Sequence, residues 1–96
     1  MKKALKVEPI DNVAIILEDI KKGDSCSYGD NKQQITNHDI SFGHKIALID
    51  ISPGEDIVKY GQIIGYATQP IKKGDWVHNH NIQSDRGRMK KERPLR

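Results

Sequence analysis

Two histidines one residue apart, His78 and His80, follow the only tryptophan of the 96-residue chain, Trp76. In an extended strand, residues two apart face the same side, so the three rings are expected to form one row with Cα atoms about 6–7 Å apart. Imidazoles at that spacing are suited to hold a divalent metal ion or an anionic ligand. The alternative is a pair of solvated or hydrogen-bonded strand histidines, and the pattern alone does not separate the two.

Few other residues suggest chemistry. His44, which follows Gly43, is a candidate third member of the histidine set, whereas His38 lies in a polar stretch and is expected to be exposed. Cys26, also in polar surroundings, is expected to be an inert thiol, because no activating base can be identified for it. The chain shows no paired acid–base carboxylates, nucleophile elbow, phosphate-binding Walker loop or paired cysteines. By itself it is underequipped for catalysis.

Composition predicts one small, soluble domain. Only 35% of the residues are hydrophobic, so the core is thin and surfaces shared with a partner are expected to matter for stability. No run approaches the roughly 20 apolar residues of a membrane span, and the N-terminus has no long apolar signal segment. The single cysteine cannot form an internal disulfide, which favours a reducing, cytoplasmic location.

The positive charge is concentrated at the C-terminus. Residues 86–96 carry six basic side chains and one acid, whereas residues 1–85 carry ten basic and twelve acidic side chains. The chain therefore divides into a mildly acidic domain, 1–85, and a basic tail, 86–96. The tail has no interleaved aromatic residues for base stacking, so we expect a solubilising or partner-docking end and no nucleic-acid binding.

The pattern of apolar residues predicts a mostly-β domain without a long helix. Residues 13–18, 45–51, 57–60 and 76–82 are expected to be extended, and the alternation in 45–51 predicts a strand covered on both faces. Residues 25–34 are polar and loop-like, with room for a hairpin tip. Residues 63–71 are ambiguous, although Gly65 and Pro70 argue against a long helix.

A short pattern occurs three times, as DIKKGD at 19–24, DISPGE at 50–55 and PIKKGD at 70–75. Each copy has an isoleucine, two turn residues, a glycine and an acid. The isoleucine is suited to anchor in the core, and the glycine to adopt a backbone angle that other residues resist. The repeat therefore predicts three similar turns, and chemistry is expected in the residues that differ after them.

Three ordered motifs resemble a known family. GHKIAL at 43–48, KYGQIIG at 59–65 and GDWVHNHN at 74–81 are similar to motifs of the SAF domain of the altronate/galactarate dehydratase family, and the resemblance covers residues 5–82. It implies a β-clip fold and a cytoplasmic hydro-lyase of sugar acids. In many members this domain precedes a large part that holds most of the catalytic apparatus. The stand-alone arrangement also resembles the small subunit of sulfolactate sulfo-lyase, whose partner is a separate large chain.

The resemblance implies a β-elimination next to a carboxylate, in which water leaves a sugar acid or sulfite leaves sulfolactate. It implies a divalent metal, iron in the altronate enzymes, at a site shared with the large subunit, with His78 and His80 as metal ligands. Strand packing with a snorkelling lysine is the alternative for two of the motif positions, Lys59 and Tyr60. The implied substrate-binding residues are His44, Lys45, Lys59, Tyr60, Gln62 and Asn81.

The resemblance implies a large catalytic subunit as partner and an anionic sugar acid or sulfo acid as ligand. Self-association is expected when that partner is missing. Two other classes remain open: a β-clip assembly module of the kind found in pilus, flagellar and antifreeze proteins, and a regulatory module that contacts RNA through the basic tail.

Overall fold

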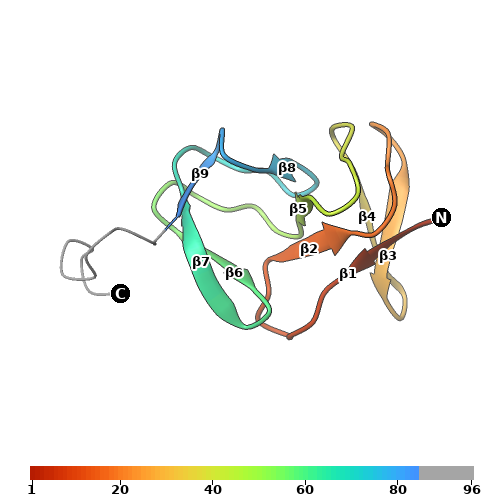
Figure 1. Ribbon diagram of the computed structural model, residues 1–96, viewed down its shortest axis with the longest axis horizontal. Coiled ribbons are helices and arrows are strands. Elements are labelled where there is room, and N and C mark those ends of the chain that lie inside the picture. The colour runs from red at the N-terminus through yellow and green to blue at the C-terminus, as the bar shows by residue number, and fades with distance from the viewer. Residues whose placement is uncertain (85–96) are drawn as a thin grey trace.

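The computed structural model describes residues 1–84, which contain nine short β-strands and no helix (Figure 1). The mostly-β prediction is confirmed, and the short, bent strands form a compact β-clip domain. This part of the chain therefore has no helix that is long and apolar enough to span a membrane. Residue 85 and the basic tail lie outside the described residues, so the predicted boundary at residue 85 stays a prediction. The strands are β1 (Lys2–Leu5), β2 (Val13–Ile16), β3 (Ser25–Gly29), β4 (Lys32–Ile35), β5 (Lys45–Ala47), β6 (Asp56–Lys59), β7 (Gln62–Ala67), β8 (Trp76–Val77) and β9 (Ile82–Ser84).

The strands form two sheets. The six-stranded sheet has the order β4-β3-β1-β2-β5-β8, and the three-stranded sheet has the order β6-β7-β9. The pair β1–β3 is parallel, and the other strand pairs are antiparallel. In Figure 1, β6, β7 and β9 lie on one side of β2 and β5, and the β3–β4 hairpin lies on the other. The two central strands are therefore covered on both faces.

Side-chain alternation along β2 and β5 divides the core into two clusters. Val13 and Ala47 face one cluster, whereas Ala14 and Ile46 face the other. This confirms that the segment beginning at residue 45 is buried on both faces. The first cluster contains Val13, Ala47, Ile51, Ile57, Ala67, Ile71 and Val77, and the second contains Ala14, Ile16, Ile20, Cys26, Ile40, Ile46 and Leu48.

Several predicted boundaries are wrong. The strand expected over residues 45–51 ends at Ala47, and Ile49, expected to be covered, is 52% exposed because the chain bends away from the sheet. Residues 25–34 form the β3–β4 hairpin, in which only Cys26 points fully into the core. The sequence predicted a loop here because the residues on the exposed face and in the tip of the hairpin are polar. The segment 13–18 is a strand only to Ile16, and the ambiguous segment 63–71 contains most of β7.

The repeated pattern does form similar turns, and the chain contains a fourth copy that was not identified from the sequence. DISFGH, residues 39–44, has the same isoleucine and glycine positions. All four glycines have positive φ, between 88° and 94°, which a residue with a Cβ adopts only under strain. The four isoleucines pair across the turns through isolated bridges, Ile20 with Ile40 and Ile51 with Ile71. The copies therefore make two pairs of facing turns.

Aspartates at the start of the turns connect each pair. In the first pair, Asp19 accepts a hydrogen bond from the amide of Phe42, and Asp39 accepts one from the amide of Lys22. In the second pair, Asp50 accepts from the amide of Lys73. The fourth equivalent bond is absent because proline stands at both positions, Pro53 without a donor and Pro70 without an acceptor. Because the donor and the acceptor of this one bond are both missing, neither an amide nor a carboxylate is left without its partner.

Candidate functional site

The histidine-containing segment is a tight loop, and the predicted strand over residues 76–82 is wrong. β8 ends at Val77, and the chain turns before β9 begins at Ile82. Asn81 closes this turn, because its Oδ1 accepts from the amide of His78 at 2.9 Å and its Nδ2 donates to the carbonyl of Trp76 at 2.9 Å. Asn81 is 4% exposed, so it holds the loop in shape from inside the domain.

The rings predicted to form a row do come together, but through stacking. The His78 ring lies parallel to the His44 ring, with centroids 4.9 Å apart, and parallel to the Trp76 ring, with centroids 5.3 Å apart. His80 contacts Trp76 at a tilt of 42°. The indole Nε1 of Trp76 donates to Nδ1 of His44 at 3.1 Å. The structure thus brings together His44, His78 and His80 around one indole.

His44 reaches this cluster because it occupies a special position in the fourth turn. In the other three copies, an acid at this position accepts a hydrogen bond from an amide of its own turn. In the fourth copy, the backbone amide of His44 still closes the turn on the carbonyl of Ser41 at 3.0 Å. The imidazole has no such structural bond to the turn and stacks against the loop after β8. Aligning DISFGH with the three recognised copies would have revealed this from the sequence.

Two lysines extend the cluster. Lys45, the first residue of β5, pairs with Ile15 of β2 and with Val77 of β8. Burial, followed by the neighbouring charge of Lys59, lowers the pKa of Lys45. Burial also lowers the pKa of His78, and the charges of His44, Lys45 and His80 lower it further. These influences indicate that the five basic side chains share one region.

Among residues 1–84, no acid forms an ion pair with this region. The ion pairs formed among residues 1–84 join Lys2 to Glu18, Lys21 to Asp39 and His38 to Asp75, and none of them includes a residue of the cluster. Lys59 instead lies with its ammonium 5.2 Å from the ring centroid of Tyr60. We define the cationic cluster as His44, Lys45, Lys59, His78 and His80. Its charge and partial exposure suit an anionic ligand.

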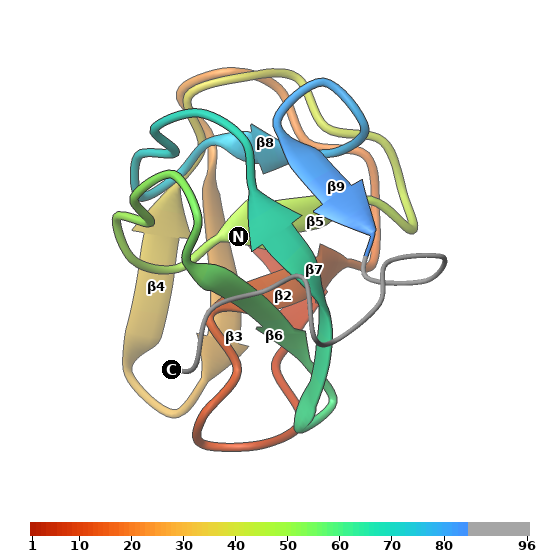
Figure 2. The same cartoon turned by 90° about the vertical axis from the view of Figure 1, so that its left-hand side faces the viewer.

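The hairpin that carries Lys59 is fixed by two polar residues that the sequence analysis missed, the buried Asp11 and the half-buried Asn12. Tyr60 and Gly61 form its two-residue tip with φ of 55° and 74°, and a tyrosine in this conformation is strained by about 1–2 kcal/mol. Asp11 accepts from the amide of Gly61 at 2.7 Å, and Asn12 bonds to the backbone of β6. Figure 2 shows the β1–β2 connection running beside this tip. The polar pair directly before the apolar strand 13–16 was the available signal.

Asp11 is buried, and its carboxylate also accepts from the amides of Val7 and Glu8. Burial acts to raise its pKa, but hydrogen bonds from the amides of Glu8, Gly61, Val7 and Tyr60 outweigh burial and lower it. Because the folded-state pKa lies below the unfolded value, the carboxylate stabilises the fold fully at pH above the unfolded value. That contribution is lost as the pH falls through the folded-state pKa.

Replacing Asp11 with asparagine is therefore expected to lower the free energy of unfolding by about 1–3 kcal/mol at neutral pH, because an amide accepts through only one of its two ends. Urea denaturation at neutral and acidic pH measures the effect, and the difference from the unmodified chain should narrow as the pH falls. Asp30→Asn, in the exposed turn between β3 and β4, is the matched control. A deficit that does not depend on pH would contradict this account.

The chain is similar in sequence to several known proteins. Residues 2–85 match the family described as the altronate/galactarate dehydratase SAF domain. The chain belongs to this family. It is 41% identical over 81 residues to an altronate dehydratase of Escherichia coli (strain K12), a match that covers 84% of this chain and 16% of the relative. It is also 40% identical over 73 residues to a galactarate dehydratase (L-threo-forming) of the same organism, covering 76% of this chain and 14% of the relative.

A third relative is a separate subunit. The chain is 40% identical over 47 residues to the (2R)-sulfolactate sulfo-lyase subunit alpha of Chromohalobacter salexigens, covering 49% of this chain and 50% of the relative. The matched segment thus spans only about one sixth of the dehydratases and half of the sulfo-lyase subunit.

Three other residues considered in the sequence analysis, Gln62, His38 and Cys26, do not belong to the cationic cluster. Gln62 is exposed at the start of β7, opposite Lys59 in the hairpin. His38 is exposed, as expected, with Nε2 3.4 Å from a carboxylate oxygen of Asp75. Cys26 is fully buried, and burial raises the pKa of its thiol, which agrees with an inert cysteine.

The SAF domain does not contain a complete metal site within residues 1–84. No group of three or more histidine, cysteine, aspartate or glutamate side chains there is arranged to hold a metal ion. Metal sites in proteins generally use three or four protein ligands. His78 and His80 are therefore at most part of a ligand set, and the residues described do not fit an independent iron site.

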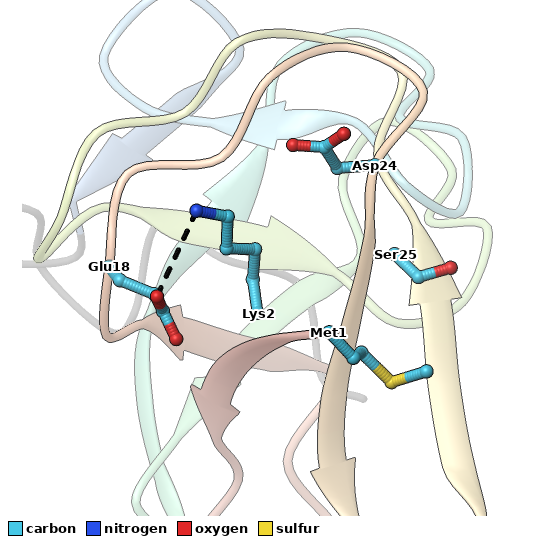
Figure 3. Close-up of a pocket in the computed structure, with 5 residues that line it drawn as sticks. All are labelled: Met1, Lys2, Glu18, Asp24 and Ser25. Carbon is cyan, nitrogen blue, oxygen red and sulfur yellow. Dashed lines mark ion pairs between the residues drawn. The ribbon is translucent and has the colours of Figure 1, made fainter.

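A separate hollow near the N-terminus is lined by Met1, Lys2, Glu18, Asp24 and Ser25 (Figure 3). Its lysine is paired with Glu18 at 3.9 Å, and Asp24 binds the amide of Lys21. None of the residues predicted for the site lies in it. The hollow is open and its charges are mixed, so it offers no comparable preference for an anion.

Proposed function

We propose that this SAF domain is the small, ligand-binding part of a two-part lyase that eliminates water from a hydroxy acid of the altronate or galactarate type. The observation that carries the proposal is the cationic cluster, in which two lysines and three histidines have no carboxylate within ion-pairing distance among residues 1–84. A sugar acid supplies the negative charge that these groups lack. Membership of the dehydratase SAF family supports the substrate class.

The reaction has requirements that the cluster meets only in part. A base removes the proton from the carbon next to the carboxylate, the β-hydroxyl leaves as water after taking up a proton, and the resulting enol becomes a 2-keto-3-deoxy acid. Negative charge develops on the carboxylate as the proton is lost. Lys45 and Lys59 are suited to stabilise that charge, because both are at least partly removed from solvent.

The remaining groups are assigned to a large catalytic polypeptide. No carboxylate pair stands beside the cluster in the described part of the chain, and a divalent metal would need ligands beyond His78 and His80. The dehydratase relatives are about six times longer than the matched segment, which leaves room for such a part in them. We propose that the cationic cluster faces that part and contributes one wall of a shared site.

Elimination of sulfite from sulfolactate is the second candidate. It is favoured by the 40% identity over 47 residues to a relative whose name identifies it as one subunit of a sulfolactate sulfo-lyase. The two candidates share the β-elimination and differ in the substrate and in the leaving group. Release of sulfite from sulfolactate, or of a 2-keto-3-deoxy acid from altronate or galactarate, distinguishes them.

The purified chain alone is expected to be folded, rich in β-structure and inactive toward altronate, galactarate and sulfolactate. Circular dichroism and product assays measure this, and the active counterpart is the same chain co-expressed with a large dehydratase-like polypeptide. A stable complex that turns over one of the three acids is the expected result. Turnover by the isolated chain, or failure of the two chains to associate at any salt concentration, would overturn the proposal and favour an assembly module.

A further inference from the structure

The hydrogen bond between Trp76 and His44 determines which ring nitrogen of His44 carries the proton, as well as where the ring lies. An indole N–H donates and cannot accept, so Nδ1 of His44 must be the acceptor in the 3.1 Å contact. A nitrogen that accepts a hydrogen bond carries no proton. While this contact is made, the single proton of the neutral imidazole is therefore on Nε2.

The orientation of the ring is fixed from a second direction. His78 stacks on His44 with only 8° between the ring planes, and it stacks on Trp76 with 10°. The indole bond limits rotation of the His44 ring within its plane, and the stacking limits tilting out of the plane. Ile46 pairs with Trp76 across β5 and β8, which holds the indole next to the residue that precedes β5. The Nε2–H of His44 is thus a preorganised donor.

We propose that Trp76 is a positioning residue that keeps His44 in the Nε2–H tautomer, so that His44 donates a hydrogen bond to an anionic oxygen of the ligand and does not bind metal. The inference rests on the proposed function for the identity of the ligand but not for the tautomer. To coordinate a metal through Nε2, His44 would need its proton on Nδ1, where it would face the indole N–H. Coordination would therefore break the bond to Trp76.

This assignment divides the histidines of the cluster by role. His44 is a neutral donor stacked on His78, and the charge of Lys45 acts on that same His78 ring, a combination that suits a carboxylate. His78 and His80 have no hydrogen bond from a ring nitrogen in the described residues that would assign their tautomers. They remain the two histidines of the cationic cluster that can serve as nitrogen ligands for a metal shared with another polypeptide.

Nuclear magnetic resonance of the ¹⁵N-labelled 96-residue chain tests the tautomer directly. We expect a scalar coupling across the hydrogen bond between Nε1 of Trp76 and Nδ1 of His44, and a proton on Nε2 of His44. Trp76→Phe keeps an aromatic ring but removes the donor, so the coupling should vanish and both tautomers of His44 should appear. Tyr28→Phe, in the same hydrophobic cluster, should leave the His44 signals unchanged.

Two outcomes of this experiment overturn the positioning role. One is a proton on Nδ1 of His44 in the unmodified chain, and the other is a tautomer ratio that Trp76→Phe does not change. If Trp76→Phe fails to fold, the coupling in the unmodified chain still decides. Adding Zn²⁺ should leave the Nε2 proton and the coupling in place, and loss of either would overturn the statement that His44 does not bind metal.

Galactarate then tests the donor role in the chain with its large partner. His44→Asn keeps an acceptor for the indole but lacks the distal donor, whereas His44→Gln carries an N–H far enough out to replace it. We expect His44→Asn to weaken galactarate binding about tenfold or more and His44→Gln to restore part of the loss. Equal effects of both variants would overturn the donor role. If His44 has the expected tautomer but the complex does not bind galactarate, altronate or sulfolactate, the proposed anion site is wrong. The positioning role of Trp76 would still hold in that case.

Discussion

Replacing Gly74 with alanine is expected to lower the free energy of unfolding by about 3–5 kcal/mol, whereas the same replacement at Gly23 should lower it by about 1–2 kcal/mol. Both glycines occupy the same position in identical Ile-Lys-Lys-Gly-Asp segments, with φ of 94° and 90°. A Cβ in this conformation is strained at either position. The difference must therefore come from what surrounds each glycine.

The surroundings differ sharply. A Cβ on Gly74 would lie 2.5 Å from the carbonyl oxygen of Ile35, whereas at Gly23 no heavy atom of the described residues lies within 4 Å. The carbonyl of Ile35 belongs to the backbone and cannot swing away as a side chain would. The backbone of Gly74 also accepts from the amide of Asn37 and donates to Ala47, so it cannot shift without breaking those bonds.

Urea denaturation followed through the fluorescence of the single tryptophan, two residues beyond Gly74, measures the effect. Circular dichroism should give the same midpoint for a two-state domain. A domain of this size has a total stability of about 5–10 kcal/mol, so Gly74→Ala should leave it close to unfolding. Equal losses at the two glycines would show that conformation alone accounts for the cost and that the contact with Ile35 relaxes.

The comparison of these two turns shows which structural features a sequence pattern can predict. The repeat predicts the positive φ of each glycine because that requirement is local. It does not predict the close approach of Ile35, which depends on how a distant hairpin packs against the turn. The same distinction applies to the strands, since the strand class follows from β-branched residues and alternation, whereas strand ends depend on side-chain bonds such as those of Asn81.

The candidate site shows the same limit in more detail. The motifs singled out His44, Lys45, Lys59, His78 and His80, and the structure brings these side chains into one region, whereas their roles in binding stay predictions. The expected geometry, a row along a strand, was wrong because the loop after β8 is closed by a buried asparagine. The contact that assigns the His44 tautomer joins residues 32 positions apart, and no local pattern indicates it.

Replacing Lys45 with methionine is expected to lower kcat/KM for the anionic substrate about tenfold to a hundredfold in the complex with the large polypeptide. A hydrogen bond from a charged donor to a carboxylate contributes about 1.5–3 kcal/mol, and each 1.4 kcal/mol corresponds to a factor of ten. Methionine keeps the packing of the partly buried stem and removes only the charge. It also removes the repulsion that acts on Lys59 and His78, so the stability of the domain should not fall.

Lys72→Met is the matched control, because Lys72 is exposed in a turn and takes no part in the cationic cluster. Steady-state kinetics of both variants, with unfolding measured separately, separates loss of binding from loss of fold. The Lys45 variant should also respond less to added galactarate in the spectra of His44 and His78, since the ligand would lose its neighbouring charge. If Lys45→Met and Lys72→Met have the same kinetics, the unpaired charge of the cluster does not serve substrate binding, and the anion must be held by the large polypeptide alone.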